Sequence, residues 1–199
     1  MLSRRRLLLA ACLLAALAAP WRVVAQATGA PPGASALLLR LARVDEGLRV
    51  SYSARLELPK TIDEALHKGV PLYFQAELRI SRQRWYWRDA TVARAERQWR
   101  LAFQPLTRQY RVSTGGLHQG FDTLAEALTV IGRAGAWEVA LREEAQADAG
   151  YEMSFRLRLD TTQLPGPLQI GLGLGAQLEV AQQRPLAPAE LMPVPTAKE

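Results

Sequence analysis

Few residues of this chain have the types and spacing that catalysis or metal binding requires. The two histidines are His67 and His118, and neither has a second histidine beside it at the spacing of a metal-ligand pair. We expect His67 to end a short helix and His118 to lie in a turn. The one cysteine, Cys12, lies close to the N-terminus, so thiol chemistry is not expected in the folded domain. The sequence therefore predicts no catalytic residue, no metal site and no cofactor.

Two further patterns lack the context that their chemistry needs. Glu143 and Glu144 lie in a polar segment, whereas a carboxylate-based hydrolase needs two acids that converge from different elements. The segment 171–176 superficially fits a dinucleotide-binding fingerprint, but that motif joins a strand to a helix. Here the hydrophobic alternation continues through the glycines to Val180, which indicates a strand. An envelope hydrolase with paired carboxylates remains an alternative, and a protein that is not an enzyme is favoured.

The most unusual surface candidate is the segment 79–100, in which arginines are interleaved with aromatic residues. Arginine among aromatic rings can bind anionic groups, glycans or acidic protein segments. In the structural alternative, Trp85 and Trp87 face the core while the arginines form a solvated face. The candidate binding patch is the centre of this segment: Arg84, Trp85, Tyr86, Trp87 and Arg88.

Residues 1–25 have the organisation of a secretory signal peptide. Three arginines, Arg4 to Arg6, precede an uncharged apolar run over 7–19, and Ala25 offers a small residue before a cleavage site. We therefore expect a periplasmic protein without a transmembrane segment after signal cleavage. The Leu-rich run favours the general secretory route, while a twin-arginine route and lipidation of Cys12 stay open.

The formal charge of +6 suggests a polyanionic partner, but most of the excess charge lies in the signal segment. The signal segment contains four of the 25 basic residues and no acid, which leaves 21 basic and 19 acidic residues in the remainder. The nearly neutral remainder gives no support to a nucleic-acid partner.

Hydrophobic alternation with period two dominates the rest of the chain and predicts strands with one buried face. The segment 48–58 shows it most clearly, with 37–44 as its hairpin partner. The other clear strands are expected over 72–81, 151–159 and 168–180, and weaker ones over 85–87, 97–103, 107–113 and 137–141.

Two short helices interrupt these strands. Thr61 with Glu64, and Thr123 with Glu126, each predict a capping box, and Gly69 occupies a C-terminal capping position. The expected organisation is a signal peptide at 1–25, a flexible lead-in at 26–35, one β-rich domain at 36–182, and a Pro-rich disordered tail at 183–199.

Four motifs of this block resemble a proteobacterial exported family, the domain of unknown function 4390. They are Ala65–Leu72, Leu106–Val112, Phe121–Leu128 and Leu157–Leu168, and they follow the family's order over about residues 36–181. The resemblance implies an exported protein of unassigned activity. It also implies genes that often neighbour a membrane sensor kinase of the nitrogen-regulation type and its response regulator.

These observations together predict a mainly β protein, an antiparallel β-sandwich with two short α-helices. The leading functional hypothesis is a binding module of the cell envelope, an accessory to a membrane sensor kinase system. Its expected partner is an envelope protein or an anionic glycan or lipid. The alternatives are the hydrolase and a carrier protein. The carrier would hold a hydrophobic ligand in an apolar cavity between the sheets.

Overall fold

The computed structural model describes residues 34–44, 47–83, 89–143, 145–164, 166 and 178–192. Nine strands lie within these residues, and α-helices and short 3-10 helices (η) join them. In chain order the elements are β1 (Ala34–Val44), β2 (Gly47–Leu56), α1 (Lys60–His67), β3 (Leu72–Arg82), β4 (Ala90–Gln104), β5 (Gln109–Thr114), β6 (Leu117–Phe121), α2 (Leu124–Ile131), β7 (Arg133–Ala140), β8 (Tyr151–Leu159), η1 (Thr161–Gln163), β9 (Glu179–Leu186) and η2 (Pro188–Glu190).

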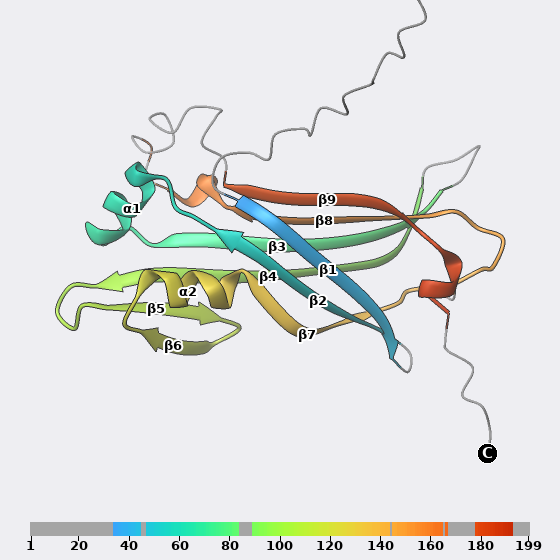
Figure 1. The fold of residues 1–199 in the computed structure, drawn as a ribbon, viewed down its shortest axis with the longest axis horizontal. Coiled ribbons are helices and arrows are strands. Elements are labelled where there is room, and N and C mark those ends of the chain that lie inside the picture. Colours follow the sequence, from blue (N-terminus) through green and yellow to red (C-terminus); the bar gives the residue numbers. More distant parts are fainter. Residues whose placement is uncertain are drawn as a thin grey trace, which may run out of the picture.

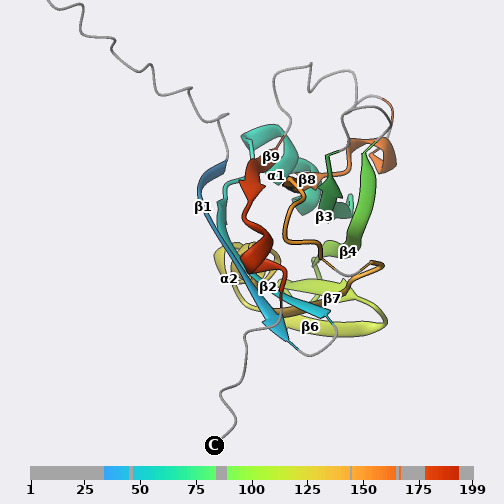
Figure 2. The same cartoon turned by 90° about the vertical axis from the view of Figure 1, so that its right-hand side faces the viewer.

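The strands form two antiparallel sheets that pack face to face (Figures 1 and 2). The small sheet has the order β1-β2-β7, and the large sheet has the order β6-β5-β4-β3-β8-β9. The sheets approach each other at two edges, because β1 contacts β9 and Ala93 of β4 bridges to Leu141 just after β7. The predicted fold, a mainly β sandwich of antiparallel sheets with two short helices, is confirmed.

The alternation in the sequence matches the alternation in burial. In β8, which has the predicted bounds, every second residue from Tyr151 to Leu159 is buried, and the residues between them are half-buried or exposed. Tyr52 from the small sheet packs on Phe155 from the large sheet, with ring centroids 4.9 Å apart. Each such side chain contributes about 1.5–3 kcal/mol through burial, so the core determines which face of each strand points inward.

The helix α2 begins as the sequence predicts. The Thr123 side chain accepts a hydrogen bond from the backbone N–H of Glu126, and the Glu126 carboxylate accepts one from the backbone N–H of Thr123. At its other end, the Tyr52 hydroxyl donates to the carbonyl of Ile131 at 3.1 Å, and the Ala54 N–H donates to the carbonyl of Gly132 at 2.8 Å. Contacts with β2 therefore hold the end of α2 against the small sheet.

The predicted capping box of α1 is wrong. Pro59 is the capping residue, and its carbonyl accepts hydrogen bonds from the N–H groups of Ile62 and Asp63. Thr61 thus lies inside the helix, where its hydroxyl cannot cap the first turn. Gly69 follows the helix with a φ of +90°, the left-handed conformation that the sequence predicts for a glycine there.

The weaker predicted strands are parts of longer elements or lie outside the described residues. Strand β4 includes 97–103, β7 covers most of 137–141, and β5 begins after a turn in which Arg108 has a φ of 54°. The predicted strand at 85–87 lies outside the described residues. Of the predicted stripe at 168–180, the described part begins at Leu178, which is buried.

The β-structure continues beyond the domain end that the sequence predicts at 182. Strand β9 runs through Pro185 to Leu186, and η2 follows it. Proline is tolerated here because β9 is an edge strand: Pro185 lies across from Glu152, and no described strand pairs with the other side of β9. Residues 193–199 of the predicted tail lie outside the described residues. None of the described helices is long and apolar enough to cross a membrane.

Candidate functional site

The predicted binding patch, Arg84, Trp85, Tyr86, Trp87 and Arg88, lies outside the described residues. The structure describes β3 and β4, the two strands that the patch connects along the chain. Arg82 at the end of β3 pairs with Ala90 at the start of β4, and the two strands remain paired down to Leu72 and Leu101. The patch therefore joins the two central strands of the large sheet.

The described arginines of the segment 79–100 have different surroundings, so they do not form one surface. Arg82 forms an ion pair with Glu143 at 3.2 Å. Arg97 points to the inner face, where its guanidinium lies 5.4 Å from the ring centroid of Trp137. Trp99 is buried in the core, whereas Trp85 and Trp87, the two tryptophans of the structural alternative, lie outside the described residues. Arg79, Arg94 and Arg100 are exposed on the outer face.

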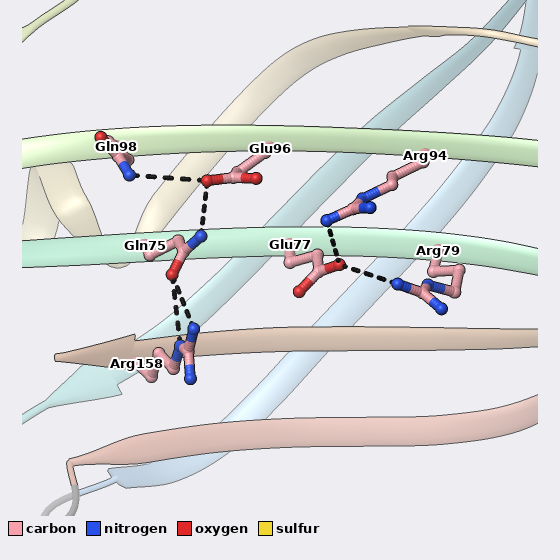
Figure 3. A network of polar contacts seen from close by, with 7 residues as sticks. All are labelled: Gln75, Glu77, Arg79, Arg94, Glu96, Gln98 and Arg158. Carbon is pink, nitrogen blue, oxygen red and sulfur yellow. Dashed lines mark hydrogen bonds and ion pairs between the residues drawn. The ribbon is translucent and has the colours of Figure 1, made fainter. Parts of the chain in front are cut away.

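The outer face of β3, β4 and β8 carries a network of charged side chains (Figure 3). Arg79 and Arg94 lie directly across from each other on neighbouring strands. Both reach the same carboxylate oxygen of Glu77, at 3.5 and 3.3 Å. One glutamate thus holds two arginines side by side at the surface. Ion pairs this exposed contribute little stability, because water screens them.

A second row of the network crosses the same three strands. The Arg158 guanidinium of β8 donates to the Gln75 side-chain oxygen at 2.9 and 3.3 Å. The Gln75 amide donates in turn to Glu96 of β4, and Gln98 donates to the same oxygen of Glu96. These bonds orient the polar side chains across the sheet (Figure 3).

The described part of the outer face of the large sheet is mostly polar and carries more positive than negative charge. Strand register places six arginines and four glutamates on it among the described residues. They are Arg79, Arg94, Arg100, Arg111, Arg156 and Arg158, with Glu77, Glu96, Glu152 and Glu179. All six arginines are exposed. A shallow hollow of about 480 Å³ on this face is lined by Glu77, Arg79, Arg156 and Gln183, among others. We call this surface the charged face.

A different cluster, not predicted from the sequence, joins α1 to the large sheet. The Nδ1 atom of His67 lies 2.9 Å from the carbonyl oxygen of Asp63, and its Nε2 atom lies 2.8 Å from the Tyr110 hydroxyl. A carbonyl only accepts, so Nδ1 carries a proton, and in the neutral ring Tyr110 donates to Nε2. Phe103 packs against both rings, with centroids 4.8 and 5.1 Å away. The spacing of Asp63 and His67 by one helical turn is the feature of the sequence from which part of this cluster could have been predicted.

This cluster is suited to fixing α1 and not to nucleophilic chemistry. Burial raises the pKa of Tyr110 above its ordinary value of 10.0, and the negative charge of Asp63 raises this pKa further. The phenol therefore keeps its proton at neutral pH, whereas a nucleophile would need the opposite shift. His118, the other histidine, is exposed in β6 and its Nδ1 lies 2.8 Å from the Ser113 hydroxyl.

The described carboxyl groups offer no support for the hydrolase alternative. Hydrogen bonds from Thr162 hold the pKa of Asp160 below its usual range, and a hydrogen bond from Arg184 does the same for Glu190. A catalytic general acid needs a raised pKa. Within the described ranges, no three side chains of His, Cys, Asp or Glu gather as a metal site would require. Glu143 pairs with Arg82, while Glu144 and the segment 171–176 lie outside the description.

Residues 33–184 match the family described as "Domain of unknown function (DUF4390)". The chain belongs to this family. The resemblance inferred from the four motifs is thereby confirmed. No curated protein and no solved structure matches the chain.

The structure places several family motif residues at turns and helix ends. Gly69 ends α1, Arg108 lies in the turn before β5, and Thr123 caps α2. Asp160 caps η1 by accepting hydrogen bonds from the N–H and the hydroxyl of Thr162 at 3.1 and 2.6 Å. The first two motifs of the family meet in space through the bond between His67 and Tyr110. These motif residues of the DUF4390 family therefore have structural roles in this chain.

Proposed function

We propose that this protein is a binding module of the cell envelope that uses the charged face to contact an acidic region of a partner protein. The observation that supports this proposal is the row of exposed arginines that β3, β4, β5 and β8 present on one side of the sandwich. Arginine is well suited to carboxylate partners, because its planar guanidinium binds two oxygens at once. The candidate patch at 84–88 connects β3 to β4 along the chain and lies outside the described residues.

A protein partner explains the mixture of charges better than a polyanion does. Glu77 and Glu96 lie among the arginines and would repel a uniformly negative glycan or lipid surface. A protein surface with carboxylates opposite the arginines and a few cations opposite the glutamates would complement both signs. The gene neighbourhood that the family resemblance implies makes a membrane sensor kinase the first partner to test.

The test is photo-cross-linking in living cells from position 98. Gln98 is exposed near the middle of the charged face, and Ala42 is exposed on the outer face of the small sheet as a control position. We expect the probe at 98, and not the probe at 42, to capture a protein with an acidic envelope segment. Equal capture from both positions, or from neither, would contradict the proposed surface.

Charge reversal tests the role of the arginines. We expect Arg94→Glu combined with Arg100→Glu to reduce the cross-linked product at least tenfold, since each charge-assisted contact is worth about 1.5–3 kcal/mol. Arg40→Glu on the small sheet is the matched control and should leave the product unchanged. Trp85→Ala with Arg88→Ala should abolish cross-linking while the thermal unfolding curve stays the same. Unchanged cross-linking in that variant would remove the patch at 84–88 from the proposed surface.

A further inference from the structure

A groove outside the sandwich lies between α2 and the small sheet. It has a volume of about 730 Å³ and is lined by residues of β1, β2, α2 and the start of β7. It faces away from the charged face, because Leu38, Ser53 and Arg133 lie on the outer side of the small sheet. Figure 2 shows β1, β2 and α2 on the same side of the molecule. Pockets for small ligands span about 300–1,000 Å³, so the groove has the size of such a site.

The lining of the groove is mainly aliphatic. Leu56 and Leu128 are buried beneath it, and Leu58 and Leu124 are half-buried. Leu38 on β1 is 66% exposed, which is unusual for a leucine on a strand. An exposed leucine beside such a groove leaves an apolar surface that a ligand can cover.

The polar side chains of the groove have described partners, except for those of Ser53 and Arg133. Arg55 and Glu57 form an ion pair with each other at 3.2 Å. The Thr129 hydroxyl donates to the carbonyl of Ala125 at 2.7 Å. Arg133 is exposed and forms no ion pair with any described carboxylate, and Ser53 lies directly across from it on β2. The groove therefore combines an apolar lining with one available cation.

This arrangement of apolar and polar side chains determines which class of ligand the groove can bind. A bound peptide brings an N–H and a C=O with every residue, and these groups cost free energy when they are buried without partners. In the described lining, the polar side chains other than those of Ser53 and Arg133 bond to each other or to the backbone. An alkyl chain needs none until its head group, and Arg133 provides a partner for one negative charge.

We infer that the groove binds a long-chain fatty acid, with the alkyl chain along the leucines and the carboxylate at Arg133 and Ser53. This site is separate from the charged face, so it goes beyond the proposed function. Neither proposal depends on the other.

The test is the titration of the purified full-length chain with laurate by isothermal titration calorimetry. Dodecyltrimethylammonium has the same chain length with a positive head group and serves as the matched control ligand. We expect saturable binding of one laurate per chain, and at least tenfold weaker binding of the cationic ligand. Absence of saturable laurate binding, or equal binding of both ligands, would overturn the inference.

Two variants locate the site. Arg133→Glu should weaken laurate binding at least tenfold and strengthen binding of the cationic ligand, because only the head-group contact changes sign. Ala125→Trp, at an exposed position of α2 in the groove lining, should abolish binding of both ligands by filling the groove. Arg40→Gln, on the same outer face but outside the lining, is the control and should bind laurate like the wild type.

The remaining outcomes also decide the question. Laurate binding that Ala125→Trp leaves intact would overturn the inference. If that variant does not fold, Leu38→Glu takes its place, since this exposed position tolerates a charge without disturbing the core. A dimer in sedimentation velocity that Ala125→Trp dissociates, together with no laurate binding, would assign the groove to a second copy of the chain.

Discussion

At the scale of single residues, the bond between Tyr110 and His67 joins α1 to β5, 43 residues later in the chain. Tyr110 is almost fully buried, and Phe103 packs against both rings. The Tyr110 hydroxyl lies 2.8 Å from Nε2 of His67. Nδ1 of His67 in turn donates to the Asp63 carbonyl within the same helix. This hydroxyl therefore adds a polar contact to the apolar packing of Ile62 and Leu66, which holds α1 against the core.

We predict that Tyr110→Phe lowers the free energy of unfolding by about 1 kcal/mol, the typical net value of one intramolecular hydrogen bond. Tyr73→Phe is the matched control, because Tyr73 is half-buried on the outer face of β3 and its hydroxyl has no described hydrogen bond. Urea denaturation monitored by fluorescence measures both variants. Equal stability of the two variants would show that the bond to His67 contributes nothing.

Arg97 shows where prediction from single residues fails. Alternation along the segment 79–100 does not reveal that Arg97 points inward, because a charged residue is expected to face water. In the structure its guanidinium lies over the buried ring of Trp137. Burial raises the pKa of Tyr52, and the positive charge of Arg97 opposes this effect. The strand register decides the direction of this side chain, and the register depends on residues elsewhere in the sheet.

At the scale of elements, the end of α2 depends on a glycine at a point of close approach. Gly132 has an ordinary helical φ of −74°, so no special backbone conformation is required. A Cβ atom there would lie 2.3 Å from the Ala54 carbonyl oxygen and 3.2 Å from that of Leu128. The contact between α2 and β2 leaves no room for a side chain.

We predict that Gly132→Ala destabilises the protein by about 3 kcal/mol, because overpacking against rigid backbone atoms forces α2 away from β2. Gly135→Ala, in the strand β7 that follows Gly132, is the control, since a Cβ at that position meets nothing within 4 Å. Thermal unfolding followed by circular dichroism compares the two. A Gly132→Ala variant as stable as Gly135→Ala would contradict the close approach.

The two helices also show what a short motif can predict. Both contain Thr-x-x-Glu-Ala-Leu, yet only Thr123 caps its helix. Before α1, Pro59 has extended backbone angles and a carbonyl that accepts the first helical hydrogen bonds, so the helix starts earlier than the motif predicts. A capping motif predicts that a helix lies nearby, while the preceding backbone decides at which residue it begins.

At the scale of the whole molecule, the segment after residue 182 completes the sandwich. Leu186 at the end of β9 and Leu191 after η2 are both buried. The Arg184 guanidinium donates to both carboxylate oxygens of Glu190, at 3.0 and 2.8 Å, and connects β9 to η2. Both β9 and η2 contact β1 of the small sheet, so this segment closes one edge between the two sheets.

We predict that a chain ending at residue 182 is destabilised by more than about 4 kcal/mol, because it loses two buried leucines that cost about 2–5 kcal/mol each when truncated. The double variant Leu186→Ala with Leu191→Ala keeps the chain length and should reproduce most of this loss. Urea denaturation measures both. A shortened chain with wild-type stability would place the end of the domain at 182, as the sequence analysis expected.

The charged face is a property of the assembled sheet. The sequence by itself indicates only one segment, 79–100, in which arginines are interleaved with aromatic residues. The face also includes Arg111 from β5 and Arg156 and Arg158 from β8, and it excludes Arg97. Residues far apart in sequence share a face when their strands pair in register, and no local pattern reveals this pairing.

Local patterns alone determined the fold class, most strand positions, the second helix cap and the family. Alternation with period two determines which residues can be buried together, and four motifs in the family's order were specific enough to identify DUF4390. Only the tertiary structure decided the inward direction of Arg97, the bond between His67 and Tyr110, the groove beside α2 and the extent of the charged face. Each of these features joins elements that are distant in sequence. They depend on strand order and register, which long-range packing determines.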